Sequence, residues 1–384
     1  MLALFTSFSR LTAATTGYEC LFWDYDKISE IKSKPEYAHL VELCVRKAES
    51  FLSLQPLTVM NKEWSFNDDF HYYVTTAGYW WPEERNGRIY YVNRDGQTNP
   101  EVKDLDFNKV KEMAERLQHF SLSYFFTHDR RFLQAFKRQL DVWFINKETY
   151  MYPNFEYAQV IPGRNDNRGR PVGLIDAHPF NTILDSIRLI ESVGSIGRSR
   201  KEKVKAWFAA FADWMVDSEI GKGDRIGNSN SSVSYDVTLL NMAVFTQKSD
   251  LVKELIAEFP EKRINVQILE DGRLPKELTR TNAFSYSIAN LRFMVEFCIM
   301  SQNLGEDIYF QNRKRFDAAI QFLYHALNNK ETFPYKQDGG WKYTDMWLET
   351  LVHRFRRLNS TIEKDLSITL PESEVTSMDE WVSF

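Results

Sequence analysis

Apolar residues recur at helical spacing along most of this chain of 384 residues, and no series of alternating apolar and polar residues indicates strands. The pattern predicts an all-α protein. The expected helices cover residues 37–54, 106–127, 129–146, 178–193, 200–217, 235–247, 249–258, 285–303, 309–328 and 343–358. Asp129 and Ser199 stand where the N-caps of two of these helices would lie. A hydrophobic content of 43% is ample for a large core.

Some segments between the expected helices are long and rich in polar and aromatic residues, namely 60–105, 150–176, 218–234 and 271–284. Loops longer than ~12–15 residues inside a compact domain are usually functional. Helix pairs joined by alternating short and long loops fit an α/α toroid, or incomplete barrel, with the long loops on one face. No Pro- or Ser-rich linker divides the chain, so we expect one domain over residues 1–359. Residues 360–384 read as an acidic, peripheral C-terminal tail.

Charge and composition exclude several functional classes. The net charge is −5 without a basic block, which disfavours nucleic-acid binding. No apolar run approaches the ~18 residues of a membrane span. The three cysteines, Cys20, Cys44 and Cys298, are widely spaced and odd in number, so they form neither a disulfide framework nor a metal set. Without paired His at helical spacing or a calcium-type loop, we expect no metal and no cofactor.

Three motifs follow one another along the chain. The first holds His71-Tyr72-Tyr73, then Tyr-Trp-Trp-Pro at 79–82 and Arg-Asp-Gly-Gln-Thr-Asn-Pro at 94–100. The second is Asn-Phe-Glu-Tyr-Ala-Gln at 154–159, with Ile-Pro-Gly at 161–163 and the stretch from Gly169 to Asp176. The third is Arg-Thr-Asn-Ala-Phe-Ser-Tyr-Ser-Ile-Ala-Asn-Leu at 280–291. In this order and at these spacings they resemble the alginate-lyase superfamily of polysaccharide lyases.

The resemblance implies β-elimination across a uronic-acid linkage, in which a base removes the proton at carbon 5 and the glycosidic oxygen leaves carbon 4. A group bound to the uronate carboxylate stabilises the negative charge that develops. By resemblance, Arg280 and Asn230 are these groups, and Tyr286 is the base and also the acid. A tyrosine phenol has an ordinary pKa near ~10, so a neighbouring Arg would help by favouring the phenolate.

The same resemblance, together with residue chemistry, suggests a set of substrate-binding residues. They are Tyr79, Trp80, Trp81, Arg94, Gln97, Asn154, Tyr157, Gln159, Arg164 and His178. Flat aromatic rings can stack on sugar C–H faces, and arginines can bind carboxylates. The alternative is that some of these side chains only hold loop geometry. The expected partner is a polyuronate, either alginate rich in mannuronate or glucuronan, bound by a monomer. A polymeric substrate suggests a secreted or periplasmic protein, although the N-terminus shows no clear signal peptide.

One position departs from the family pattern. Members of the superfamily carry Asn-Asn-His before Tyr-Asp-Val, and here the run before Tyr235 places Ser231 at the position of the His, after Asn230. Serine cannot replace imidazole as a base near neutral pH. Three hypotheses follow: syn elimination by Tyr286 alone, replacement by another histidine such as His178 or His71, or an impaired or inactivated protein.

Two other functional classes remain open at this stage. A non-catalytic glycan-binding relative would explain the loss of the base. A glycoside hydrolase on a similar toroid would need a pair of carboxylates as acid and base. Asp69, Asp176 and Asp236 are available for such a pair, but their spacing does not single one out.

Overall fold

The computed structural model describes residues 20–101 and 106–369, and its described part is mostly helical, as the periodicity predicts. The chain divides into two compact units. The N-terminal unit contains residues 26–226 together with Cys20, and the C-terminal unit contains residues 227–369 together with 21–25. The single domain expected over 1–359 stays a prediction. Most of the expected acidic tail, residues 370–384, lies outside the described residues.

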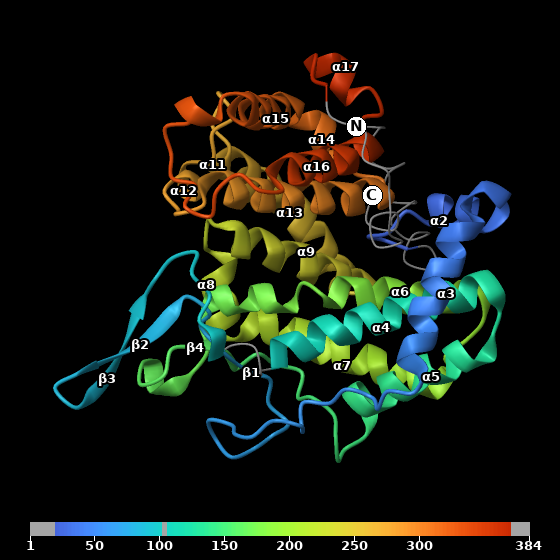
Figure 1. The fold of residues 1–384 in the computed structure, drawn as a ribbon. Coiled ribbons are helices and arrows are strands. Elements are labelled where there is room, and N and C mark those ends of the chain that lie inside the picture. Colours follow the sequence, from blue (N-terminus) through green and yellow to red (C-terminus); the bar gives the residue numbers. More distant parts are fainter. Residues whose placement is uncertain (1–19, 102–105, 370–384) are drawn as a thin grey trace. The chain divides into compact units, whose positions relative to one another are not determined.

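The helices of the N-terminal unit are labelled in Figure 1. They are α2 (Tyr25–Ser33), α3 (Ala38–Leu52), α4 (Asp106–Thr127), α5 (Arg130–Leu140), α6 (Phe180–Val193), α7 (Arg198–Asp217) and α8 (Glu219–Arg225). Helix α4 packs against α3, α5 and α6. The cap predicted at Asp129 is confirmed, because its carboxylate accepts the backbone N–H of Arg131 at 2.8 Å. The cap predicted at Ser199 is wrong, since α7 already begins at Arg198 after Gly197, whose φ is 94°.

Four short strands of the N-terminal unit escaped the periodicity analysis. Strands β1 (Val74–Thr76) and β4 (Tyr157–Val160) pair in parallel, and β2 (Trp80–Arg85) pairs with β3 (Arg88–Asn93) in an antiparallel hairpin. The hairpin turns at Asn86 and Gly87, which both have positive φ, the signature of a tight two-residue turn. In Figure 1 the hairpin projects away from the helices of its unit.

The helices of the C-terminal unit are α9 (Asn230–Phe245), α10 (Ser249–Phe259), α11 (Asn265–Gln267), α12 (Pro275–Leu278), α13 (Ala283–Asn303), α14 (Ile308–Gln311), α15 (Arg313–Asn328), α16 (Thr344–Leu358) and α17 (Ile362–Leu366). Helix α13 packs against α9 and α16, and α9 also packs against α10. The rings of Phe259 and Phe297 stack with centroids 3.7 Å apart. The segment 21–25 belongs here because the Leu21 carbonyl accepts the Asn303 amide at 3.0 Å.

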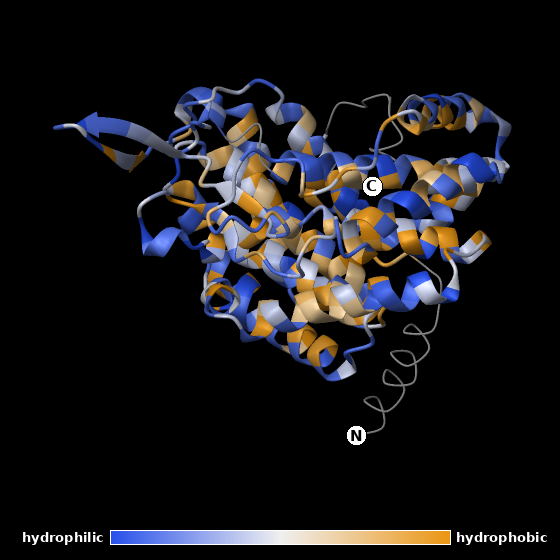
Figure 2. Ribbon diagram, turned by 90° about the horizontal axis from the view of Figure 1, so that it is seen from below, coloured by the Kyte–Doolittle hydropathy of each residue, from blue (hydrophilic) through white to orange (hydrophobic). Residues whose placement is uncertain are grey.

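Hydrophobic and hydrophilic residues alternate around most helices in Figure 2, as amphipathic helices require. Helix α9 differs, because every residue from Ser231 to Val244 is buried. A helix that is buried all round has no need of a polar face. Among the described helices, none is both long and apolar enough to cross a bilayer.

Candidate active site

The four residues expected to carry the chemistry all lie in the C-terminal unit, at the starts of its two central helices. Asn230 is the first residue of α9, and Ser231 follows it. Tyr286 lies in the first turn of α13, and Arg280 lies between α12 and α13. A transition from loop to helix therefore lies between Arg280 and Tyr286.

Arg280 and Tyr286 form a close cation–π pair. The guanidinium carbon of Arg280 lies 3.7 Å from the centroid of the Tyr286 ring. The Arg280 side chain is 26% exposed and Tyr286 is half-buried, so both can meet a ligand. A positive charge over the ring favours the negatively charged phenolate over the neutral phenol.

A buried carboxylate connects Asn230 to this pair. Oε1 of Glu277, on α12, accepts the backbone N–H of Asn230 at 2.9 Å and the Nδ2 amide of Asn290 at 3.1 Å. Its other oxygen, Oε2, lies 3.9 Å from Nη1 of Arg280. Burial raises the pKa of Glu277. Sequence reasoning missed this residue, because nothing in the stretch Pro-Lys-Glu-Leu marks one acid as a partner of a helix start 47 residues away.

A second loop holds the start of α13 in place. The Oε1 atom of Gln337 accepts the Phe284 backbone N–H at 3.1 Å, and its Nε2 donates to the Ser285 hydroxyl at 2.8 Å. Asn282 pairs with Gln337 through an isolated β-bridge, and its Oδ1 accepts the Gly339 N–H at 2.6 Å. The turn that carries Tyr286 is thus held by side-chain and backbone hydrogen bonds together.

Ser231 is buried near the start of α9. Its hydroxyl oxygen lies 3.0 Å from that of Ser229. A hydroxyl can donate and accept hydrogen bonds, but it does not titrate near neutral pH. The position that the resemblance assigns to a histidine therefore contributes polarity without a base.

In the N-terminal unit, Gln159 is held by a buried network. Its Nε2 donates to Asp176 at 2.9 Å, and the hydroxyls of Tyr73 and Thr75 donate to the other oxygen of that carboxylate at 3.0 Å each. Arg170 donates to the Gln159 side chain and backbone oxygens, both at 3.0 Å. Burial raises the pKa of Asp176 from its usual 3.8 to about 6. Gln159 has a positive φ of 51°, so its backbone is strained at a candidate subsite.

Glycines allow the chain to pass close to the strand that carries Gln159. A Cβ atom at Gly173 would lie 2.6 Å from the carbonyl oxygen of Ala158, and one at Gly169 would lie 2.8 Å from the same oxygen. No side chain fits at such distances without displacement of the backbone. The second motif therefore contains glycine here for a steric reason.

The hairpin tryptophans are each covered on one face by an arginine. The guanidinium carbon of Arg164 lies 4.5 Å from the Trp80 ring centroid, and that of Arg94 lies 5.0 Å from the Trp81 centroid. The Trp81 indole N–H donates to the Gln97 carbonyl at 2.9 Å. Each pair combines a cation with an aromatic ring, which suits a sugar that carries a carboxylate. Because the two tryptophans are consecutive in strand β2, the two pairs lie on opposite faces of the hairpin.

The remaining substrate-binding candidates include several with local structural roles. The Tyr79 carbonyl accepts the Arg94 N–H at 2.7 Å, and the Asn154 side chain accepts the Glu156 N–H at 3.2 Å in a turn. The Tyr157 ring packs edge-on against Tyr72, with centroids 5.1 Å apart. His178 precedes α6, and its carbonyl accepts the Asn181 amide at 2.9 Å.

Arg164, Arg168 and Arg170 lie within seven residues of sequence, but each has a different partner. Arg168 pairs with Glu156, while Arg170 is half-buried against Gln159. Arg164 and Arg168 are both exposed, and Nη2 of Arg164 donates to a carbonyl of strand β3 at 3.1 Å.

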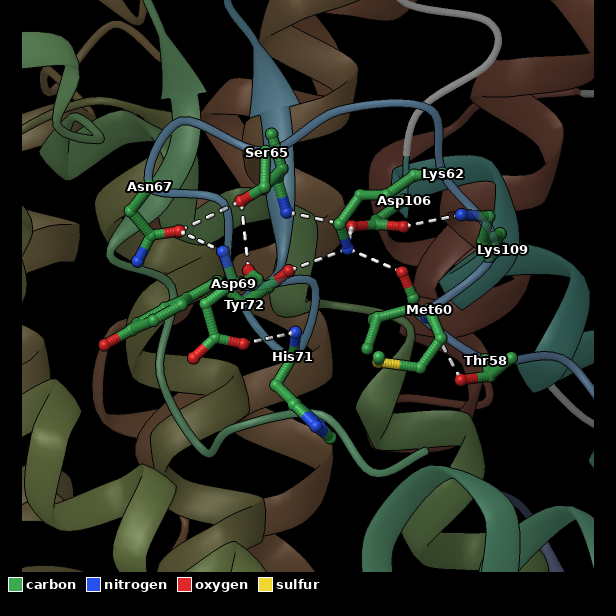
Figure 3. Close-up of polar contacts among 12 residues, drawn as sticks. Thr58, Met60, Lys62, Ser65, Asn67, Asp69, His71, Tyr72, Asp106 and Lys109 are labelled. Carbon is green, nitrogen blue, oxygen red and sulfur yellow. Dashed lines mark hydrogen bonds and ion pairs between the residues drawn. The ribbon is translucent and has the colours of Figure 1, made fainter. Parts of the chain in front are cut away.

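The segment that precedes β1 is anchored by a buried lysine (Figure 3). The Lys62 amine donates to Asp106 at 2.7 Å, to the Val59 carbonyl at 2.6 Å and to the Tyr72 carbonyl at 2.8 Å. The same Asp106 oxygen accepts the Val74 N–H at 3.0 Å. Desolvation lowers the pKa of Lys62. This network fixes the backbone on both sides of Tyr73.

Comparison with known proteins identifies the family. The alginate lyase family profile matches residues 59–333. The fold is similar to an alginate lyase from Bacteroides ovatus, with 31% identity, 94% of this chain and 98% of that chain covered, and a TM-score of 0.88. Alginate lyase A1-III from Sphingomonas species A1 is similar in fold at 14% identity, with 82% and 87% covered and a TM-score of 0.51. A histidine-to-alanine variant of A1-III complexed with a tetrasaccharide gives 15% identity, 88% and 91% coverage and a TM-score of 0.52.

No curated protein matches the chain. Within the ranges that the structure describes, no group of His, Cys, Asp and Glu could hold a metal ion. The similarity to solved alginate lyases confirms the predicted α/α-toroid class. A profile match over most of the length and a related structure at 31% identity agree on one assignment. This chain belongs to the alginate lyase family of polysaccharide lyases.

Proposed function

We propose that this protein cleaves a 1,4-linked polyuronate by β-elimination, with Tyr286 as base and acid and with Arg280 and Asn230 at the uronate carboxylate. The observation that carries the proposal is the Arg280 guanidinium 3.7 Å from the Tyr286 ring centroid. The phenol is held beside a charge that favours its ionised form, and that charge is of the sign that binds a carboxylate.

The proposed reaction needs one proton acceptor and one proton donor. The Tyr286 phenolate removes the carbon 5 proton, and the electron pair left behind forms the double bond between carbons 4 and 5. The bond from carbon 4 to the glycosidic oxygen breaks, and that oxygen takes the proton back from the Tyr286 phenol. Arg280 and the Asn230 amide stabilise the enolate-like charge on the carboxylate as it grows.

The serine at position 231 favours a substrate that a single tyrosine can process. One residue can serve as base and acid only if the proton and the leaving oxygen lie on the same face of the sugar. β-Linked mannuronate and glucuronate meet this condition, so mannuronate-rich alginate and glucuronan are the proposed substrates. The two arginine–tryptophan pairs, Arg164 with Trp80 and Arg94 with Trp81, support an anionic sugar as ligand.

A catalytically impaired, glycan-binding relative is the second candidate function, and Ser231 is the observation that favours it. A glycoside hydrolase has less support, because its candidate carboxylates have other roles. Asp236 pairs with Arg263 at 2.7 Å, Asp176 accepts hydrogen bonds from Tyr73, Thr75 and Gln159, and Asp69 accepts the His71 backbone N–H at 3.0 Å.

Product chemistry tests these proposals. The protein is incubated separately with mannuronan, guluronan and glucuronan, and both ultraviolet absorbance and new reducing ends are followed. Elimination leaves an unsaturated sugar that absorbs in the ultraviolet, and we expect this on mannuronan or glucuronan. New reducing ends without absorbance would establish hydrolysis instead. If both signals are absent and immobilised protein retains the polymer, the protein is a glycan-binding relative without activity.

A further inference from the structure

Glu277 occupies an unusual position for a charged side chain. It is fully buried on the four-residue helix α12, and it contacts both partners of the proposed carboxylate site. Oε1 accepts the Asn230 backbone N–H, while Oε2 lies 3.9 Å from Arg280 and has no hydrogen-bond partner among the described residues. Burying a carboxylate without full hydrogen bonding costs free energy.

The surroundings of Glu277 offset only part of that cost. The charged groups that act on it are Arg280 and Lys276, and both favour its ionised form. The amide of Asn290 donates to it at 3.1 Å and also to Gln267 at 2.8 Å, so that amide is shared. A residue that served packing alone would not need a charge here, since an apolar or amide side chain would fill the space at lower cost.

We propose that Glu277 is a positioning residue that joins the start of α9 to Arg280, so that Asn230 and the guanidinium meet one carboxylate in a fixed geometry. This inference rests on the proposed function. Oε1 fixes the backbone from which the Asn230 side chain projects. Oε2 attracts the guanidinium, which also packs against the Tyr286 ring.

The two oxygens can be tested separately. Glu277→Gln keeps the size and the Oε1 acceptor, so it should keep Asn230 in place but lose the attraction for Arg280. Glu277→Ala loses both contacts. Displacement of a binding group by about 1 Å can cost roughly a hundredfold in rate. We therefore expect kcat to fall about tenfold in Glu277→Gln and about a hundredfold or more in Glu277→Ala.

KM should change less than kcat in both variants, because the interaction strengthens as charge develops on the carboxylate. Glu296→Gln is the matched control. Glu296 is also buried in the C-terminal unit and accepts Nη1 of Arg354 at 2.6 Å, and it lies roughly three helical turns beyond Tyr286 along α13. It should lower the melting temperature without lowering kcat by more than about twofold.

The outcomes separate this inference from the proposed function. A wild-type protein without lyase activity contradicts the proposed function. In the alternative outcome the wild type is active, while Glu277→Gln and Glu277→Ala have the same kcat as Glu296→Gln. That result overturns the role of Glu277 and leaves the proposed function intact. Glu277→Gln replaces a buried charge by an isosteric neutral group, so it remains informative if Glu277→Ala does not fold. A graded loss of kcat, from wild type to Gln to Ala, is the supporting result.

Discussion

The guanidinium carbon of Arg280 lies 3.7 Å from the centre of the Tyr286 ring, across the start of α13. Two neighbouring side chains hold this geometry. Glu277 lies on the side of Arg280, and Gln337 holds the first turn of α13 through the Phe284 N–H and the Ser285 hydroxyl. A pair that local sequence places close together is thereby restrained by one neighbour in the chain, Glu277, and by one residue distant from it, Gln337.

Tyr286→Phe removes the phenol oxygen and leaves the ring beneath Arg280. Because the proposed base is lost, we expect kcat to fall by about a hundredfold to ten-thousandfold, with little change in melting temperature. Ultraviolet absorbance on mannuronan or glucuronan measures the rate. Tyr335→Phe, on the loop that precedes Gln337, is a matched phenol deletion and should keep the activity. Full activity of Tyr286→Phe would show that the stated mechanism is wrong.

Ser231→His restores the residue that the resemblance expects after Asn230. A neutral imidazole accepts protons near pH 7, so we expect activity to rise by about tenfold or more, or to extend to guluronan. Ser231→Asn adds a side chain of similar polarity without a titrating group, and it controls for the effect of filling a buried position. If the two variants have equal activity on all three polymers, the site works without an imidazole.

The carboxyl group of Asp176 should make the stability depend on pH in a definite direction. Burial raises its pKa from 3.8 to about 6, so the folded protein binds this proton more tightly than the unfolded chain does. Above about pH 6 the carboxyl group is ionised in the folded protein, and the full free-energy cost of this buried charge lowers the stability. The cost amounts to roughly 3 kcal/mol. It disappears as the pH falls from the pKa of the folded state toward the pKa of the unfolded state.

The comparison with Asp176→Asn isolates this effect. Urea unfolding of both proteins between about pH 7 and pH 4 gives the difference in unfolding free energy at each pH. We expect the unfolding free energy of the wild type to rise relative to that of the variant as the pH falls. Loss of one hydrogen-bond acceptor adds only a constant offset, because it does not titrate. A difference that stays flat over this range would contradict the raised pKa.

Lys62→Met tests the buried ion pair with Asp106. Removal of one partner leaves a carboxylate of 0% side-chain exposure with less compensation, and we expect a loss of roughly 3 kcal/mol in unfolding free energy. Lys109→Met is the control, since Lys109 contacts the other Asp106 oxygen at 2.8 Å but is 16% exposed. We expect a loss of about 1 kcal/mol for it. Equal losses of unfolding free energy in the two variants would show that the buried amine of Lys62 stabilises the fold no more than the partly exposed amine of Lys109.

The sequence alone predicted most of the helices and the family. Helical periodicity gave α4 over 106–127 with the observed bounds, and the cap at Asp129 follows from its own side chain. These features are local, since a helix satisfies its backbone within one turn and its apolar stripe repeats along the chain. The Asn86-Gly87 pair was also a local signal for the hairpin, although the flanking strands alternate too little to be recognised by periodicity.

The tertiary structure decided how the candidate site is held. Glu277 meets Asn230 across 47 residues, and Thr75 donates to Asp176 across 101 residues. Neither contact produces a periodic pattern in the sequence, because each depends on which helix starts and strands the fold brings together. The motifs therefore predicted Arg280 and Tyr286 as reacting groups, whereas the contacts of Glu277, Gln337 and Lys62 emerged only from the packed chain. A residue's chemistry can be read from its type, but its partners are set by long-range burial and hydrogen bonding.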